Sequence, residues 1–105
     1  VRFIEFEQLP HIIPMDELKT RYYLRLNVSD RAGVLAQITR VLGDLNISIA
    51  SVIQKDSDPS AGTAEIVITT HLSREASVQR SLSLLKTLNT VTKVNNVIRI
   101  EESQD

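Results

Sequence analysis

Residues 30–51, DRAGVLAQITRVLGDLNISIAS, decide the fold, because they combine a polar turn, an amphipathic helix and the start of a strand. Apolar side chains recur there at helical spacing and predict a helix over residues 32–45. The apolar stripe consists of Val34, Leu35, Ile38, Val41, Leu42 and Leu45. Asp30 stands before this helix and can accept hydrogen bonds from its first turn as N-cap. Gly33 lies where strand gives way to helix, so the backbone there can approach another molecule closely.

The N-terminus of this predicted helix can also bind an anion. Free N–H groups and the positive end of the helix dipole suit a carboxylate or a phosphate. Residues 32–35 would supply the N–H groups, and Asp30 would place an acidic group beside them. Together they match an amino-acid zwitterion. The alternative is that Asp30 is only a helix cap, and the residues alone leave both roles open.

Strands are predicted on both sides of the helix. The segment from Arg21 alternates apolar and polar residues as far as Val28. Further strands are expected at about residues 47–55, 63–70 and 96–102, and residues 56–62, DSDPSAG, form a loop between two of them. In the strand at 47–55 we expect Ile47, Ile49 and Ile53 on one face and Ala50 and Val52 on the other. In the strand at 63–70 the inner face is Ala64, Ile66 and Ile68, and the outer face is Glu65, Val67 and Thr69.

A second amphipathic helix is predicted after the third of these strands. Ser73 can cap it, and Glu75 lies in its first turn, where a negative charge is favourable. Its buried stripe is Val78, Leu82, Leu85 and Leu88.

The order strand, helix, strand, strand, helix, strand predicts an α+β, ferredoxin-like βαββαβ fold. Both helices would cover one face of a four-stranded antiparallel sheet, with the first and third strands in the centre. The second strand would be an edge, available for pairing with another copy. Ala50, Val52, Val67 and Val97 are expected to make the helix-free face apolar enough for a second protomer or another domain to cover it.

Composition narrows the class of protein. The chain has 105 residues, enough for one domain, and a formal net charge of -1, which argues against a nucleic-acid partner. It has no cysteine, no apolar run long enough to cross a membrane and no signal-peptide pattern. We therefore predict a cytoplasmic protein without a membrane or nucleic-acid partner. The chain begins at Val1 rather than Met, which predicts a piece of a longer protein.

Other functions known for this fold are disfavoured, because the residues that they require are missing or opposed by a neighbouring residue. An RNA-recognition domain needs aromatic side chains on its central strands, and residues 63–70 have none. A metallochaperone needs a Cys pair. An acylphosphatase-like enzyme needs a phosphate-binding loop with an Arg after the first strand. Arg31 is present there, but Asp30 beside it opposes an anion, so this function is disfavoured and stays open. His11 and His71 have no acidic or His partner close in sequence, so no metal site or catalytic residue is predicted.

Four segments resemble the ACT domain, a small ferredoxin-like module that binds amino acids and regulates metabolic enzymes. They are IPMDE at residues 13–17, YYLRLNVSDRAGVLAQI at 22–38, NISIASVIQK at 46–55 and AEIVITTH at 64–71. In particular they resemble the C-terminal ACT domain of bacterial homoserine dehydrogenase, over residues 9–101. The resemblance implies feedback control by an amino acid, threonine first, of NAD(P)-dependent catalytic domains in the parent chain. No glycine-rich dinucleotide motif occurs here, so we expect a regulatory fragment that is no enzyme by itself and needs no cofactor.

The resemblance also implies a site and an assembly. The ligand would lie between two copies that pair through their edge strands as a homodimer. Asp30 would hold the ammonium group, N–H groups near residues 33–35 the carboxylate, and Ser48 or the backbone of Ile47 a hydroxyl. The ligand-binding residues implied in this way are Asp30, Arg31, Ala32, Gly33, Val34, Leu35, Asn46, Ile47, Ser48 and Ile49.

Residues 1–20 would be a strand and a connector from the missing catalytic part, and residues 21–102 the ACT domain. The apolar strip of Phe3, Ile4 and Phe6 is expected to pair with a neighbouring molecule or to lack order. Two alternatives stay open: a purely structural dimerisation module, and a regulatory subunit acting in trans on another biosynthetic enzyme such as acetolactate synthase.

Overall fold

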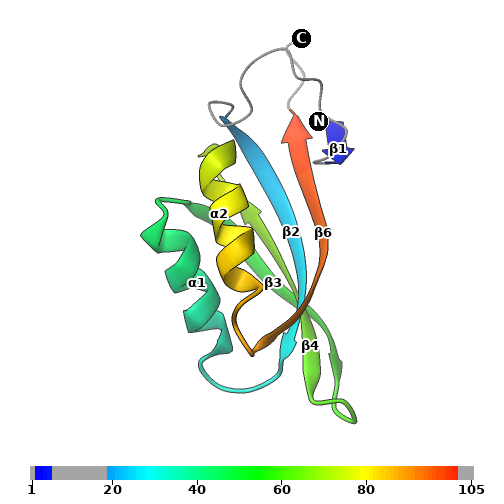
Figure 1. Ribbon diagram of the computed structural model, residues 1–105. Helices are drawn as coiled ribbons and strands as arrows, with labels where there is room; N and C mark the ends of the chain where they lie inside the picture. The colour runs from blue at the N-terminus through cyan, green and yellow to red at the C-terminus, as the bar shows by residue number, and fades with distance from the viewer. Residues whose placement is uncertain (1, 6–18, 102–105) are drawn as a thin grey trace.

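The computed structural model describes residues 2–5 and 19–101 and has two helices packed on one face of an antiparallel sheet (Figure 1). The helices are α1 (Val34–Asp44) and α2 (Glu75–Leu85). The strands are β1 (Arg2–Glu5), β2 (Lys19–Ser29), β3 (Ile49–Asp58), β4 (Thr63–Thr70), β5 (Ser73–Arg74) and β6 (Val91–Glu101). None of the helices in this described part is long and apolar enough to span a membrane.

The sheet has the strand order β1-β6-β2-β4-β3, and the short β5 pairs with the start of β2. The predicted ferredoxin-like fold is therefore confirmed, with β2 and β4 inside and β3 at one edge. The other edge differs from the expectation. β1 pairs in register with β6 of its own chain, from Arg2 opposite Glu101 to Glu5 opposite Ile98, instead of with a neighbouring molecule. Phe6 lies outside the described residues.

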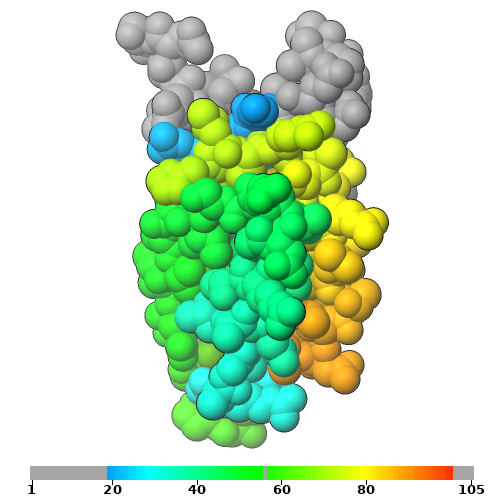
Figure 2. Space-filling view, turned by 90° about the vertical axis from the view of Figure 1, so that its left-hand side faces the viewer, coloured from blue at the N-terminus to red at the C-terminus, as the bar shows by residue number. Residues whose placement is uncertain are grey.

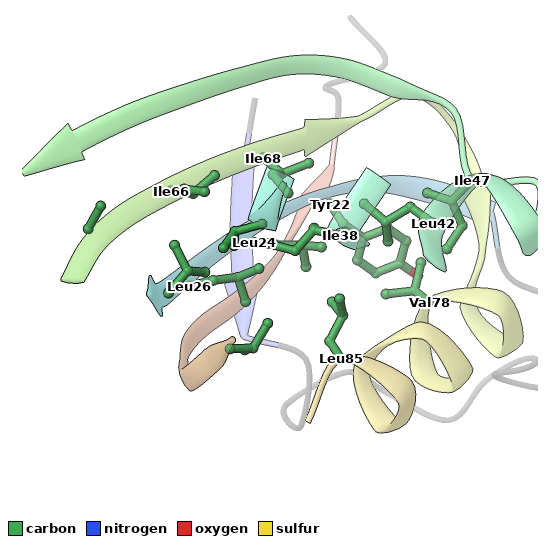
Figure 3. Close-up of a cluster of buried hydrophobic side chains, with 14 residues drawn as sticks. Tyr22, Leu24, Leu26, Ile38, Leu42, Ile47, Ile66, Ile68, Val78 and Leu85 are labelled. Atoms are coloured by element: carbon green, nitrogen blue, oxygen red, sulfur yellow. The ribbon is translucent and has the colours of Figure 1, made fainter. Parts of the chain in front are cut away.

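The core lies between the sheet and the helices, as Figure 3 shows. Strand alternation sends Tyr22, Leu24 and Leu26 of β2 toward the helices, and all three are fully buried. Val34, Ile38 and Leu42 form the buried stripe of α1, as predicted, whereas Leu35 at the flank of the stripe is 43% exposed. Val78 and Leu85 of α2 close the core from the second helix.

An irregularity in β3 changes which of its side chains face the core. Ile49 pairs with Thr70 and Ser51 with Thr69, so Ala50 is an extra residue in the ladder. Beyond this bulge Val52 packs against the core and Ile53 is 55% exposed, the reverse of the predicted faces.

The helix-free face has apolar residues among polar ones, but they differ from those expected. Val67 lies on it, whereas Val52 and Val97 pack against the core. Because Tyr23 pairs with Ile98 in register and Ile53 with Val67, these four side chains share the helix-free face.

The two helices begin later than their predicted caps. The N–H of Asp30 donates to Gly62 at 2.8 Å and so extends the strand ladder, and a turn follows before α1 begins at Val34. Gly33 is the N-cap, and no side chain caps this helix, so the N-cap role of Asp30 is wrong. The cap predicted at Ser73 is also wrong, because Ser73 pairs with Thr20 in β5 and its hydroxyl donates to the carbonyl of His71 at 2.9 Å.

Candidate ligand site

The turn segment, residues 30–35, joins β2 to α1 and presents backbone donors to solvent. Gly33 has a φ of 88°, a left-handed conformation that favours glycine, and it turns the chain into the first helical residue. The N–H of Gln37 donates to the Gly33 carbonyl at 3.1 Å. The intervening N–H groups of Leu35 and Ala36 have no backbone acceptor among the described residues. These two donors at the positive end of the helix dipole are available to a carboxylate.

The turn segment is held in place from two sides. Ser29 donates its N–H to Thr90 at 2.8 Å, and the Thr90 hydroxyl donates to the Gln37 side chain at 2.7 Å. These bonds tie the strand end and the helix start to the turn before β6. Asp30, Arg31 and Ala32 lie between them and are exposed. The side chain of Val34 is buried in the core, so this residue could offer a ligand only its backbone.

The strand-start segment, residues 46–49, leads from α1 into β3. Asn46 has a φ of 60°, a left-handed conformation that Asn tolerates better than most residues. Its N–H donates to Gly43 and the N–H of Ile47 donates to Leu42, so both residues close the end of α1. Ser48 is exposed and its carbonyl accepts from the N–H of His71 at 2.9 Å. The side chain of Ile47 is buried, so only its backbone could contact a ligand.

The structure does not bring the two predicted segments together within one protomer. They lie at opposite ends of α1, whose 11 residues span about 16 Å at 1.5 Å per residue. Figure 1 shows the same arrangement, with the turn before the lower end of α1 and the start of β3 after its upper end. A site that uses both segments therefore needs two copies of the chain.

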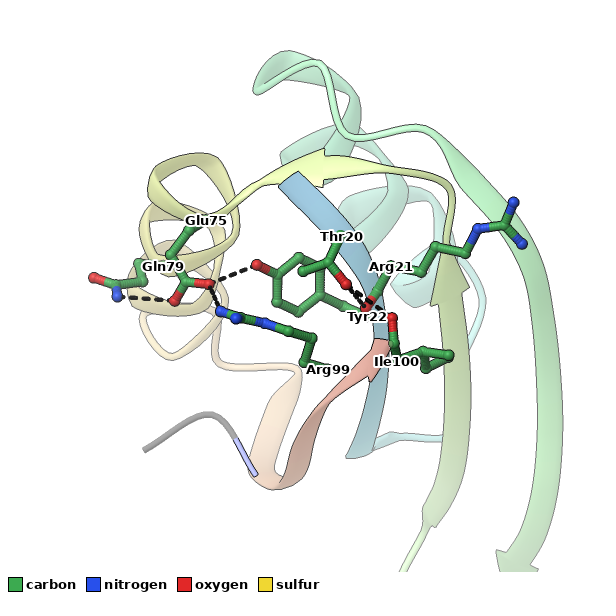
Figure 4. A network of polar contacts seen from close by, with 7 residues as sticks. All are labelled: Thr20, Arg21, Tyr22, Glu75, Gln79, Arg99 and Ile100. Carbon is green, nitrogen blue, oxygen red and sulfur yellow. Dashed lines mark hydrogen bonds and ion pairs between the residues drawn. The ribbon is translucent and has the colours of Figure 1, made fainter. Parts of the chain in front are cut away.

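A buried polar network lies under the first turn of α2, and sequence reasoning missed it (Figure 4). Glu75 is fully buried and accepts hydrogen bonds from the hydroxyl of Tyr22 at 2.6 Å and from the guanidinium of Arg99. Gln79 donates to its other oxygen at 3.2 Å, and the Arg99 guanidinium lies 5.9 Å from the centre of the Tyr22 ring. Burial, and next the bond to Glu75, raise the pKa of the Tyr22 hydroxyl far above its usual range, so Tyr22 acts as a donor.

The network ties β2, β6 and α2 together, and its position was hidden in the sequence. Glu75 does lie in the first turn of α2, as predicted, but it faces the core rather than solvent. Arg99 stands between Ile98 and Ile100 in an alternating strand, a pattern that would place the two isoleucines inside. The pairing of Tyr22 with Arg99 in register instead places Arg99 on the helix side.

The arrangement fits a binding module better than a catalytic or metal centre. No group of three or more His, Asp or Glu side chains in the described part of the chain could hold a metal ion. His71 is exposed at the end of β4. Binding of a small ligand at the helix N-terminus is the chemistry that the turn segment supports.

Comparisons with known proteins identify the family of this chain. Residues 22–89 match the family model of the ACT domain, and this match covers more than half of the chain. The chain belongs to the ACT domain family. The turn segment and the strand-start segment both fall within the matched residues of this ACT domain.

Relatives of this ACT domain include homoserine dehydrogenases. It is 39% identical to homoserine dehydrogenase of Neisseria gonorrhoeae over 98 residues, which are 93% of this chain and 22% of that protein. It is 37% identical to homoserine dehydrogenase of Methylobacillus glycogenes over 91 residues, 87% of this chain and 22% of that protein. The fold matches a crystal structure of a homoserine dehydrogenase from Thiobacillus denitrificans with a TM-score of 0.76 and 37% identity, over 91% of this chain and 21% of that one. The chain thus spans about a fifth of the length of these relatives, and the recognised resemblance is confirmed.

Proposed function

We propose that this ACT domain binds a small amino acid, threonine first, at a site shared by two protomers. Through that site it controls the catalytic domains of a homoserine dehydrogenase. The observation that carries the proposal is the placement of the turn segment and the strand-start segment at opposite ends of one helix. Each segment has groups suited to part of an amino acid, and neither has enough of them alone.

The edge position of β3 supports pairing between two copies. Its last residue, Asp58, accepts the N–H of Gly62, and Gly62 accepts the N–H of Asp30, each at 2.8 Å. The end of β3 therefore lies at the same end of the molecule as the turn segment, and the start of β3 follows the strand-start segment. Antiparallel pairing of two β3 edges about a two-fold axis would bring the start of one β3 beside the end of the other. The strand-start segment of one copy would then approach the turn segment of its partner.

Each part of an amino acid has a matching group in this arrangement. The N–H groups of Leu35 and Ala36 would bind the carboxylate, and the exposed carboxylate of Asp30 would bind the ammonium group. Ser48 from the other copy would bind a side-chain hydroxyl, which threonine has and isoleucine lacks. The exposed side chain of Leu35 would contact the methyl group of the ligand.

A ligand held by both copies would favour one arrangement of the pair over others. That difference in affinity is what can bias attached catalytic domains, since a ligand shifts an equilibrium only by binding one state better. A dissociation constant of about 0.1 mM, or roughly 5.5 kcal/mol, is enough to sense a metabolite.

The proposal is tested by calorimetric titration of the chain with threonine, isoleucine, methionine, lysine and serine, together with sedimentation. We expect a dimer that binds one threonine per chain. Asp30→Asn should weaken binding at least about tenfold through loss of a charge-assisted bond, and Glu65→Gln, a change on the helix-free face, should leave it unchanged. A dimer that binds none of the five amino acids would overturn the proposal in favour of a structural dimerisation module.

Mixing two inactive variants tests the shared site directly. Asp30→Lys removes the turn-segment half of the site, and Ser48→Trp blocks the strand-start half. In a mixed dimer one site carries both changes and the other carries neither. We expect the mixture to regain threonine binding at up to one site per mixed dimer, whereas each variant alone stays inactive. A site formed within one chain would not be restored by mixing.

A further inference from the structure

A small hollow lies at the end of the molecule where β2 begins, α1 ends and α2 begins. It has a volume of about 250 Å³ and is lined by Lys19, Leu45, Asn46, Leu72, Ser73, Arg74 and Ser77. In Figure 2 the segments that line it meet near the top of the molecule, with the start of β2 in blue and residues 72–77 in yellow-green. The turn segment lies at the opposite end of α1 of the same chain, so the hollow is separate from it.

Two positively charged residues line this hollow, and no acidic residue from the described part of the chain lines it with them. Lys19 of β2 and Arg74 of β5 are direct partners in the ladder, an arrangement in which like charges repel. Both are exposed, and neither makes an ion pair within the described residues.

Two acidic residues that the structure describes near the hollow have partners elsewhere. Glu75 follows Arg74 directly, but its carboxylate points into the core toward Tyr22 and Arg99. Asp44, near the end of α1, lies 3.9 Å from Arg40. In a chain with a formal net charge of -1, this end of the described structure therefore concentrates positive charge.

Hydrogen-bond donors accompany the two charges. The Ser77 hydroxyl and the Asn46 amide line the hollow and have no hydrogen-bond partner among the described side chains and backbone. The backbone of Asn46 has a left-handed conformation here, and this conformation sets the direction in which its side chain leaves the backbone.

We infer that this hollow is a binding site for a small anion, the carboxylate or phosphate group of a metabolite. The Arg74 guanidinium can bind two oxygens of such a group side by side, and Lys19 adds a point charge. Binding would also relieve the repulsion between the two cations. The volume lies below the roughly 300–1,000 Å³ of sites for drug-sized ligands, which excludes a dinucleotide and favours a group of a few heavy atoms.

Titration of 15N-labelled chain with sodium phosphate and with sodium acetate, at constant ionic strength set by sodium chloride, tests the inference. We expect saturable shifts in the amides of Asn46 and residues 73–77. Saturation by phosphate alone would identify a phosphate group as the ligand chemistry, and saturation by acetate would identify a carboxylate. Shifts that grow linearly with both anions, or no shifts at these amides, would overturn the site.

Charge removal adds a second readout. Arg74→Gln and Lys19→Gln should each lower the affinity for the anion that gives saturable shifts by at least about tenfold, because each removes one charge-assisted bond. Lys86→Gln, which removes an exposed charge after the other end of α2, should not change it. Equal effects of all three changes would mean that only net charge matters, and would overturn the site. Dispersed amide signals in each variant verify that it folds.

The hollow and the proposed amino-acid site share Asn46, which lines the hollow and also belongs to the strand-start segment. Threonine titration of Arg74→Gln separates the two, because neither the turn segment nor the strand-start segment contains Arg74. Retained threonine binding with lost phosphate or acetate binding would support two sites. Threonine binding without saturable anion binding in the unaltered chain would leave the proposed function standing and overturn the hollow alone.

Discussion

The phenolic hydroxyl of Tyr22 donates a 2.6 Å hydrogen bond to the carboxylate of Glu75, which lies 53 residues further along the chain. Both groups are buried, and Arg99 completes an ion pair with the same carboxylate oxygen. Buried charges are tolerated only when they are paired and hydrogen-bonded. The bond therefore links a central strand to the first turn of α2 through the Glu75 carboxylate, which is buried away from water.

Removing the hydroxyl alone tests the energy of that bond. We expect Tyr22→Phe to lower the free energy of unfolding by about 1–3 kcal/mol, because a buried carboxylate loses a donor. Chemical denaturation measures the change. Tyr23→Phe is the matched control, since Tyr23 lies on the helix-free face of the same strand and should change stability by less than about 0.5 kcal/mol. Equal losses in both variants would contradict the assignment.

Alkaline pH should weaken the fold through the same hydroxyl. Burial raises the pKa of Tyr22 in the folded state, above the value of about 10 in the unfolded chain. Below about pH 10 both states keep the proton and the contribution is complete. Above it the unfolded chain loses the proton first, so stability falls as pH rises. Urea denaturation from about pH 8 to about pH 11 should show a steeper decline in the unaltered chain than in Tyr22→Phe, and parallel curves would be the contrary result.

The ion pair of Glu75 and Arg99 should behave as a unit. Arg99→Met leaves a buried carboxylate without its counter-charge and should cost about 3–5 kcal/mol. Glu75→Leu should lower the free energy of unfolding by a similar amount, because it leaves the buried guanidinium of Arg99 without its counter-charge. The double variant should be clearly more stable than the sum of the two losses predicts, because neither charge then stays buried alone. Additive losses in thermal or chemical denaturation would show that the two side chains act independently.

Two glycines at the ends of α1 should respond in opposite directions to alanine. A Cβ at either position would meet no atom within 4 Å, so backbone conformation alone decides the outcome. Gly33 has a left-handed φ of 88°, and Gly33→Ala should cost about 1–2 kcal/mol. Gly43 lies within the helix, and Gly43→Ala should stabilise by about 0.5–1 kcal/mol. The pair is compared by thermal unfolding, and a change of the same sign in both would contradict this account.

The sequence was a good guide to elements and topology. Helical spacing identified the buried residues Ile38 and Leu42, and alternation identified the inward face of β2 and β4. It was a poor guide to caps and to the faces of β3. A bulge adds a single residue without any Gly or Pro to mark it, so the alternation after Ala50 could not be foreseen. The cap at Asp30 failed because its N–H bonds to the Gly62 carbonyl just after β2 ends, and α1 begins only at Val34.

Some parts of the candidate site could also be predicted from the sequence, and others could not. Gly33 was predicted at the junction of strand and helix and lies there as the N-cap of α1; its left-handed backbone was not predicted. Val34 and Ile47 were named as ligand residues for their backbone groups, and their side chains lie in the core. The network of Tyr22, Glu75 and Arg99, and the hollow beside Lys19 and Arg74, depend on contacts between distant strands and helices. Neighbouring residues carry no signal for such contacts.

The bulge at Ala50 also bears on how this molecule avoids forming fibres. A second register shift follows between Gln54 and Ser57, so the longest stretch of β3 that runs regularly beside β4 is residues 51–54. A flat edge strand is a template on which identical chains can stack without end, and irregular backbone is one way that native sheets prevent it. Four regular residues are enough for a short pairing with one partner strand, but too few for the long, flat pairing that a fibre needs. Deletion of Ala50 would leave each later side chain on its present face and would straighten this edge, so its first consequence should be loss of solubility rather than loss of fold.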